Sequence, residues 1–158
     1  MIYIIHASQN RQRRSLNMKI SEKTIEEIAD QLDCGMKCYL KKATGTLIIP
    51  IPDEDLNNSI STDSHSEIKE TYENPVSYIA FEEMSSRESF NVMMDFTDEI
   101  CEEPLKAALI AALRSKNPFR NFKSKIDDSE SCRQKWFAYK RNKYLEFVKM
   151  QIPDNLFK

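Results

Sequence analysis

The residues best suited to chemistry lie in the last third of the chain, where bases and aromatic rings alternate. Phe119 and Phe122 stand three positions apart, as do Arg120 and Lys123, so each pair is expected on one side of a helix. A later helix combines Trp136 with further bases. Such a surface can stack on the bases of single-stranded nucleic acid and neutralise its phosphates. The same pattern fits an amphipathic helix whose rings pack inward while Lys and Arg stems reach solvent.

These two helices define one candidate binding surface. For Arg120 we favour a structural ion pair. A guanidinium readily forms two parallel hydrogen bonds with a carboxylate, and the middle of the chain supplies many carboxylates. We expect both phenylalanines in the core. The candidate surface consists of Arg120, Lys123, Arg133, Trp136, Lys140 and Arg141.

The segments 117–123 (NPFRNFK) and 136–141 (WFAYKR) carry a family resemblance. The chain resembles an uncharacterised bacterial protein family of unknown function, whose members share a Phe-Arg-x-Phe-Lys segment followed by a Trp-containing basic and aromatic helix. The likeness extends over about residues 18–152. It implies a small intracellular bacterial protein and no activity, since the family offers no catalytic or binding residues to carry over.

Charge is spread unevenly along the chain. Residues 53–103 hold 15 acidic and two basic side chains, whereas residues 114–150 hold 11 basic and four acidic ones, although the whole chain nets only −2. The two regions either complement each other in the fold or present solvated faces. Alternatively, the last two helices form a basic surface that attracts an anionic partner.

Enzymatic chemistry finds little support. With two glycines, the chain has no phosphate-binding loop of the P-loop or the dinucleotide-binding kind. Of the two histidines, His6 lies near the N-terminus, so a Ser-His or Cys-His pair would depend on His65 in a polar segment. We predict no catalytic residue and no cofactor.

Metal binding and membrane insertion are not indicated either. Cys34 and Cys38 could share a helical face, but Gly35 lies between them and no histidine is near to complete a zinc site. The cluster 53–55 (DED) lacks the glycine and terminal glutamate of a calcium loop. No apolar run is long enough to cross a bilayer. We predict no metal, no membrane and a cytoplasmic protein with reduced thiols.

The elements that must position these residues follow from periodicity. Apolar residues recur every three to four positions over 22–33, and a hairpin at 37–51 turns at residues 43–45. A strand at 76–81 completes a three-stranded antiparallel sheet, with the proline-rich second strand at its edge. The second half is helical: one helix after the capping box Ser85/Glu88, then helices over 105–113, about 118–126 and about 130–149. This is an α+β fold.

One domain is predicted, over 18–152. Residues 1–17 are either a disordered leader or the product of a misassigned start before Met18, 53–75 is a mobile loop or partly helical insertion outside the core, and 153–158 is a tail. The helix over 105–113 is expected at the centre. The core is expected to contain Ile25, Ile28, Leu32, Tyr39, Ile48, Ile79, Phe90, Met94, Phe96, Leu105, Leu109, Leu113, Phe119, Phe122, Trp136 and Leu145.

Three functions remain open. The first is a non-enzymatic intracellular interaction module, whose partner is a protein and whose contact surface is one of the two charged regions. The second is a nucleic-acid-binding module that uses the basic and aromatic C-terminal helices. The third is a small metal-dependent hydrolase that uses carboxylates of the acidic segment.

Overall fold

The computed structural model describes residues 19–50, 62–99 and 103–156. Helix α1 (Glu22–Asp33) is followed by strands β1 (Cys38–Lys41) and β2 (Leu47–Ile48), helix α2 (Thr62–Glu73), a 3-10 turn η2 (Pro75–Ser77) and strand β3 (Tyr78–Phe81). The rest is helical: α3 (Ser86–Glu99), α4 (Leu105–Leu113), α5 (Pro118–Asp127), α6 (Glu130–Gln151) and a 3-10 turn η3 (Asp154–Leu156). The predicted α+β class, with its three-stranded antiparallel sheet and helical second half, is confirmed.

Local capping signals set the bounds of α1. The side chain of Ser21 accepts a hydrogen bond from the Thr24 backbone N–H at 3.1 Å, which satisfies a donor that the first turn leaves unpaired. At the other end, Gly35 adopts a φ of +77°, a conformation that side-chain-bearing residues rarely take. The helix therefore spans the residues predicted for it.

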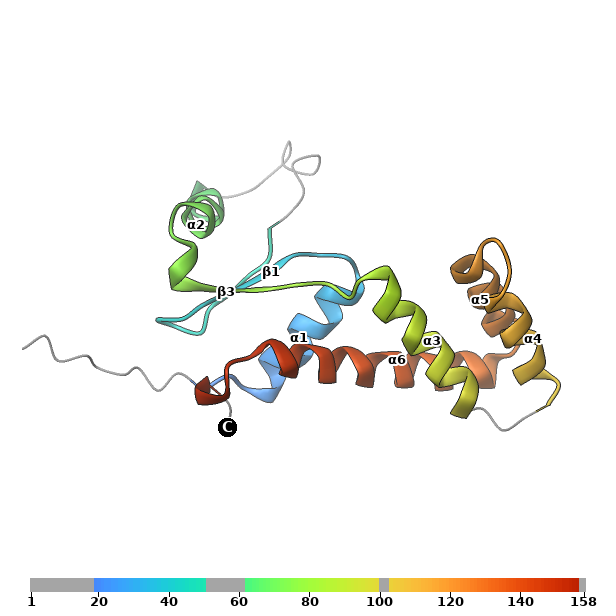
Figure 1. Cartoon of the computed structure of the whole chain (residues 1–158). Coiled ribbons are helices and arrows are strands. Elements are labelled where there is room, and N and C mark those ends of the chain that lie inside the picture. The colour runs from blue at the N-terminus through green and yellow to red at the C-terminus, as the bar shows by residue number, and fades with distance from the viewer. Residues whose placement is uncertain (1–18, 51–61, 100–102, 157–158) are drawn as a thin grey trace, which may run out of the picture.

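The sheet has the order β2-β1-β3, so β2 is an edge strand as predicted. Leu40 pairs with Leu47 and Ile79, and its side chain points toward α1 and α6. Tyr39 pairs with Ile48 and Ala80 on the opposite face. The sheet thus lies between two helical layers, α1 and α6 on one side and α2 on the other (Figure 1).

Helix α2 lies within the predicted acidic segment. Of the two forms expected for residues 53–75, the part that the structure describes, from residue 62 on, is helical. Glu70 forms an ion pair with Lys41 of β1 at 2.8 Å, and the ring of Tyr72 meets that of Tyr39 edge to face at 6.3 Å. Thr71 is buried, so this helix packs against the sheet instead of standing clear of it.

Apolar side chains form two separate clusters. The first lies between α1, the sheet and the C-terminal half of α6, and includes the fully buried Ile28, Leu40 and Val148. The second lies between α3, α4, α5 and the N-terminal half of α6, and includes Phe122 and Trp136. Only α6 contributes to both clusters in the described parts of the chain.

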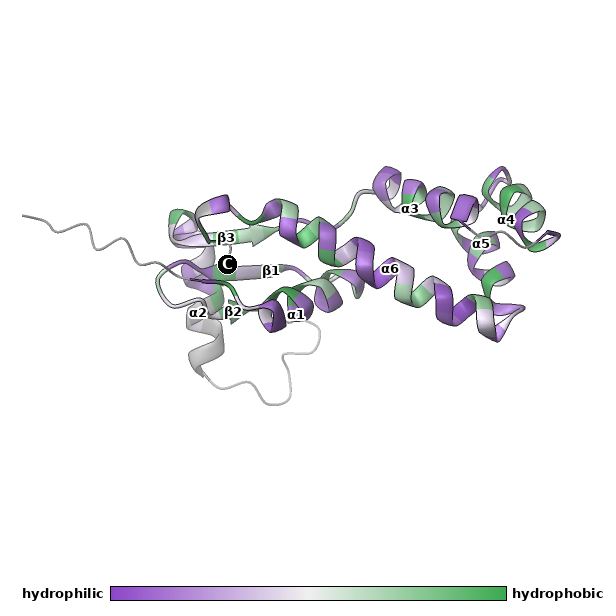
Figure 2. Cartoon of the chain, turned by 90° about the horizontal axis from the view of Figure 1, so that it is seen from below, coloured by the Kyte–Doolittle hydropathy of each residue, from purple (hydrophilic) through white to green (hydrophobic). Residues whose placement is uncertain are grey.

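The predicted central position of residues 105–113 is wrong. Helix α4 lies at the end of α6 remote from the sheet (Figure 2). It buries Leu109 and Leu113 in the second cluster and also buries Ala112, but Ala107 and Ala111 are exposed. An alanine-rich helix reads as apolar on every side, yet alanine methyls gain little from burial, so the pattern overstates what the fold must cover.

Two further core assignments are also wrong. Met94 is 38% exposed because Met93 takes the buried position and the next residue points about 100° further round the helix. Phe119 is 36% exposed because, at the start of α5, its ring meets only that of Phe90 at 6.4 Å. Tyr39, Phe90, Leu105 and Leu145 are only partly buried.

The capping box at the start of α3 is confirmed. One carboxylate oxygen of Glu88 accepts hydrogen bonds from the Ser85 N–H at 2.8 Å and from the Ser85 hydroxyl at 2.7 Å. The Glu88 N–H donates in return to the Ser85 hydroxyl oxygen at 3.2 Å. These bonds favour the ionised carboxylate and lower the pKa of Glu88 below its ordinary value of 4.5.

Because α6 joins the clusters, we predict that they unfold together. Replacing the fully buried Ile28 of the first cluster by alanine should lower the free energy of unfolding by about 3 kcal/mol. Trp136, the single tryptophan, reports on the second cluster through its fluorescence. Its urea midpoint should fall together with that of the far-UV circular dichroism signal, whereas Met150→Ala, at a residue 76% exposed, should change neither. A tryptophan midpoint unaffected by Ile28→Ala would mean that the clusters unfold independently.

The capping box predicts a pH effect. Since the pKa of Glu88 is lower in the folded chain, its carboxylate contributes stability above about pH 4.5, and this is lost as the pH falls through the lowered pKa. Glu88→Gln keeps an acceptor for Ser85 but does not titrate. The free energy of unfolding, measured in urea at pH 5 and pH 3, should therefore fall less in the variant than in the wild type. Equal losses would contradict the capping role of the carboxylate.

Candidate functional site

The six candidate residues do not form one surface. Lys140 and Arg141 both face α1: Lys140 pairs with Asp33, and Arg141 places Nε 3.2 Å from Asp30 Oδ1 and Nη2 3.5 Å from Glu26 Oε2. The bases of α6 are therefore matched along an antiparallel seam by the acids of α1, with which α6 makes extensive contact.

The matching acids lie outside the acidic stretch that the charge pattern singled out. They belong to α1, where Glu22, Glu26, Asp30 and Asp33 recur at four and three residues, and Lys149 reaches Glu22 at 3.1 Å. This spacing is a signal that the sequence carries, because it marks one acidic face of a helix. Counting charge over long segments hides it.

Trp136 is a core residue in this structure. It is 6% exposed, and its ring meets those of Phe96 and Phe122 at centroid distances of 5.0 and 4.9 Å. Arg133 lies on the surface with Nε 3.5 Å from Asp127 Oδ1, and its guanidinium carbon is 5.5 Å from the centre of the exposed Phe137 ring. Neither residue extends the basic seam of α6.

Arg120 and Lys123 remain exposed on α5. Within the described parts of the chain neither forms an ion pair, so the carboxylate partner expected for Arg120 is not present there. Both follow Phe119 on the same helix, Arg120 as the next residue and Lys123 one turn later, so an exposed aromatic ring lies beside two cations that form no ion pair in the described residues. Of the six candidate residues, these two keep their charge free for a partner.

A groove of about 210 Å³ lies beside this trio, between the two apolar clusters. Its apolar lining comes from Val92 and Met93 of α3, Phe119 of α5 and Trp136 of α6. Polar groups stand along its sides: Asp33, Ser89, Lys123, Lys140 and Tyr144, with Met84 before α3. The groove is thus a hydrophobic slot with one unpaired lysine at its margin.

A shallower hollow of about 640 Å³ continues from the groove over the outside of α5. Phe119 and Lys123 line both depressions, and Arg120 lines the outer one together with Ser124, Asp127 and Asp128. The two depressions therefore form one surface, which we call the α5 surface.

The groups near the groove are not prepared for acid-base chemistry. Burial, together with the nearby carboxylates of Asp33 and Glu83, raises the pKa of Tyr144 to about 12, so its hydroxyl stays protonated at neutral pH. Lys140 is held by its ion pair with Asp33. The arrangement can bind and orient a partner group.

Within the residues that the structure describes, no three metal-ligating side chains come together. Cys34 is exposed and Cys38 is buried, and burial raises the pKa of the Cys38 thiol to about 11. The acids 53–55 and the side chains of both histidines lie outside the described residues. No helix in the described ranges is sufficiently long and apolar to span a bilayer.

Comparison with known proteins agrees with the resemblance drawn from the C-terminal segments. The chain is similar to the UPF0158 protein PA5073 of Pseudomonas aeruginosa, with 26% identity over 135 residues that cover 83% of this chain and 81% of that protein. No solved structure matches it. The model of one uncharacterised protein family (UPF0158) matches residues 14–157, and the chain therefore belongs to that family.

Proposed function

We propose that this protein is a cytoplasmic, non-enzymatic interaction module that binds another protein through the α5 surface. The observation that carries the proposal is Phe119, a large apolar ring left 36% exposed beside the unpaired Arg120 and Lys123 and at the mouth of an apolar groove. Exposed aromatic rings next to arginine are typical of the residues that anchor protein interfaces.

The dimensions of the groove favour a protein side chain as its occupant. At about 210 Å³ the groove is smaller than the ~300–1,000 Å³ of pockets that enclose a small-molecule ligand. A single large apolar side chain of a partner can instead contact Phe119 and Trp136, while the rest of the partner lies on the open hollow outside α5. This is the arrangement of an apolar anchor surrounded by a polar rim.

The charge of the rim indicates an acidic partner segment. Arg120 and Lys123 would gain carboxylate partners on binding, and Arg120 can form the two parallel hydrogen bonds that a guanidinium makes with a carboxylate. Asp127 and Asp128 lie at the far side of the outer hollow, so the acidic groups of the partner should lie on the Phe119 side. The binding segment is therefore an apolar residue flanked by acids.

Nucleic acid is the weaker alternative. Of the residues assigned to nucleic acid by their types, Trp136 is buried and cannot stack on a base, while Lys140 and Arg141 already neutralise carboxylates of α1. A hydrolase gains no support either, since no cluster of metal ligands forms in the described ranges.

The proposal predicts that binding depends on the α5 surface. We would capture partners from a bacterial lysate with the full-length protein, with and without nuclease, and repeat the capture with the double variant Phe119→Ala/Lys123→Glu. A partner protein that the wild type still captures after nuclease treatment should not be captured by the double variant. Its affinity for the double variant should be at least tenfold lower than for the wild type, because the anchor contact and one charge are removed together. Lys23→Glu provides the control, since Lys23 is an exposed lysine of α1 that forms no ion pair with any described residue and does not line the groove.

Two results would contradict the proposal. Equal capture by the wild type and the double variant would show that the partner uses another surface. Material that disappears with nuclease, and whose binding falls steeply with salt, would move nucleic acid to first place. Unchanged thermal unfolding of the double variant would confirm that any lost binding reflects the surface and not the fold.

A further inference from the structure

The first apolar cluster carries a second surface, at the outer edge of β3. In an antiparallel pair, residues alternate between those whose N–H and C=O face the neighbouring strand and those whose groups face away. The Lys42 N–H donates to the Ser77 carbonyl at 2.9 Å, in register with the β1-β3 pairing. The next residues of β3 that face β1 are therefore Ile79 and Phe81, and both main-chain groups of Ala80 point to the outer edge.

The contacts of Gln151 confirm this direction. Its side-chain amide accepts a hydrogen bond from the Glu82 N–H at 2.7 Å and donates one to the Glu82 carbonyl at 3.0 Å. Glu82, two residues after Ala80, thus also faces away from β1. The amide of Gln151 occupies this edge in the way that the peptide group of an adjacent strand would.

Next to Gln151, the edge stays open in the described part of the chain. Ala80 is exposed, and its N–H and C=O face away from the only strand with which β3 pairs. The Tyr78 N–H donates to the Pro75 carbonyl. The Tyr78 carbonyl points to the outer edge, as the main-chain groups of Ala80 do. One donor and two acceptors are therefore left in a row, the template that an incoming strand requires.

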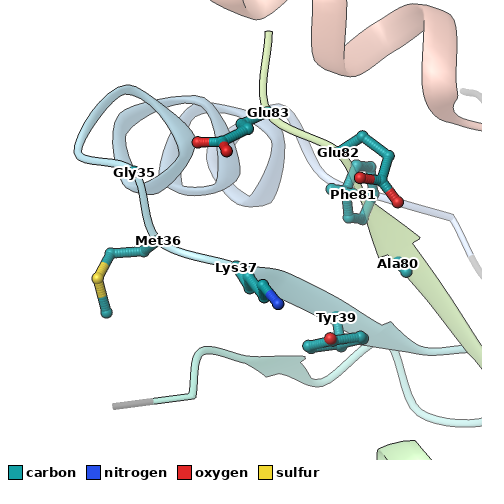
Figure 3. A pocket seen from close by; sticks show the side chains of 8 residues that line it. All are labelled: Gly35, Met36, Lys37, Tyr39, Ala80, Phe81, Glu82 and Glu83. Atoms are coloured by element: carbon teal, nitrogen blue, oxygen red, sulfur yellow. The ribbon is translucent and has the colours of Figure 1, made fainter. Parts of the chain in front are cut away.

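A hollow of about 160 Å³ adjoins this edge on the face of the sheet that carries Tyr39. Figure 3 shows Lys37 and Tyr39 along one side of it and Ala80 and Glu82 along the other. Ala80 is the register partner of Tyr39, and its small side chain leaves the space beside the tyrosine ring. A side chain on an added strand can enter this space if it lies on the same face as the methyl of Ala80.

The charges around the hollow specify the entering side chain. Glu82 and Glu83 are exposed and form no ion pair within the described ranges, against one lysine, Lys37, at the same hollow. A Lys or Arg that enters would meet the ring of Tyr39 and an unpaired carboxylate, both of which attract a cation.

We infer that the outer edge of β3 takes up an extended basic segment of a partner protein as a fourth strand. The main chain of that segment pairs with Ala80, and a lysine or arginine opposite Ala80 enters the hollow between Tyr39 and Glu82. This surface shares no residue with the α5 surface and selects the opposite charge, so the two sites stand or fall separately.

The first test uses fluorescein-labelled octapeptides of alternating lysine and threonine, with the full-length protein and fluorescence anisotropy as the readout. In an antiparallel fourth strand, the residue directly opposite Ala80 exchanges both main-chain hydrogen bonds with it, so a lysine there uses its own N–H and has its side chain on the same face as the methyl of Ala80. N-methylation of the lysines should therefore weaken binding at least tenfold, whereas N-methylation of the threonines, whose N–H groups point away, should leave binding within about twofold. A matched glutamate-threonine peptide should bind at least tenfold more weakly than the lysine peptide.

The second test changes the protein. Ala80→Pro removes an N–H that takes no part in the β1-β3 ladder, and proline is tolerated at such edge positions, so binding should fall at least tenfold while Ala80→Ser keeps it. Glu82→Gln combined with Glu83→Gln should weaken binding at least fivefold. In the wild type, hydrogen exchange of the Ala80 amide should slow when the lysine peptide is added.

Equal binding of the lysine-methylated and threonine-methylated peptides would reduce the effect to charge attraction and overturn the inference. So would unchanged exchange of the Ala80 amide at saturating peptide, a readout that does not depend on the folding of any variant. Phe119→Ala/Lys123→Glu should leave the lysine peptide bound as in the wild type, which separates a failure here from a failure at the α5 surface.

Discussion

The four-residue spacing of inward side chains on α6 determines how the rest of the molecule is arranged. Cys132, Trp136, Tyr144, Val148 and Ile152 at its end are all buried, and each step of four residues turns about 40° round a helix. Over the five steps from residue 132 to residue 152 the stripe rotates by about 200°. Its two ends therefore face different sides of α6, and the apolar elements that cover them cannot merge into one core. The groove lies in the middle of this line of side chains, where it passes from one side of α6 to the other. Trp136, Lys140 and Tyr144, which follow one another at four-residue steps, line the groove.

The charged seam between α1 and α6 specifies position more than it adds stability. Arg141 is 46% exposed, and ion pairs of that kind contribute about 0–1 kcal/mol each. Moving α6 by one turn along α1 would, however, break the ion pairs Lys149–Glu22 and Arg141–Asp30 at the same time. The apolar contacts of Val148 distinguish less sharply between the two positions of the helix. The seam also pairs the basic face of α6 with carboxylates, whereas Arg120 and Lys123 of α5 form no ion pair within the described residues.

Local signals in the sequence predicted the elements well. The cap at Ser21, the glycine after α1 and the capping box before α3 depend on residues within a few positions of one another, and each is present. The placement of α4 and the exposure of Phe119 depend on contacts between distant segments, which composition and periodicity do not encode. The candidate site shows the same division. The sequence predicts six candidate residues as one group, and only tertiary structure separates Arg120 and Lys123 from Lys140 and Arg141, whose charges carboxylates of α1 neutralise.

The two proposed surfaces would affect the molecule differently. The α5 surface includes Trp136 from the second cluster, and its groove also reaches Asp33 and Tyr144 beside the first, so a ligand there bridges both clusters and stabilises their arrangement along α6. The edge of β3 touches the first cluster alone. A strand added at Ala80 extends the sheet without reaching the groove, and a partner held there by a basic segment leaves the α5 surface open. The two proposed sites would therefore allow the chain to hold an acidic segment and a basic segment at the same time.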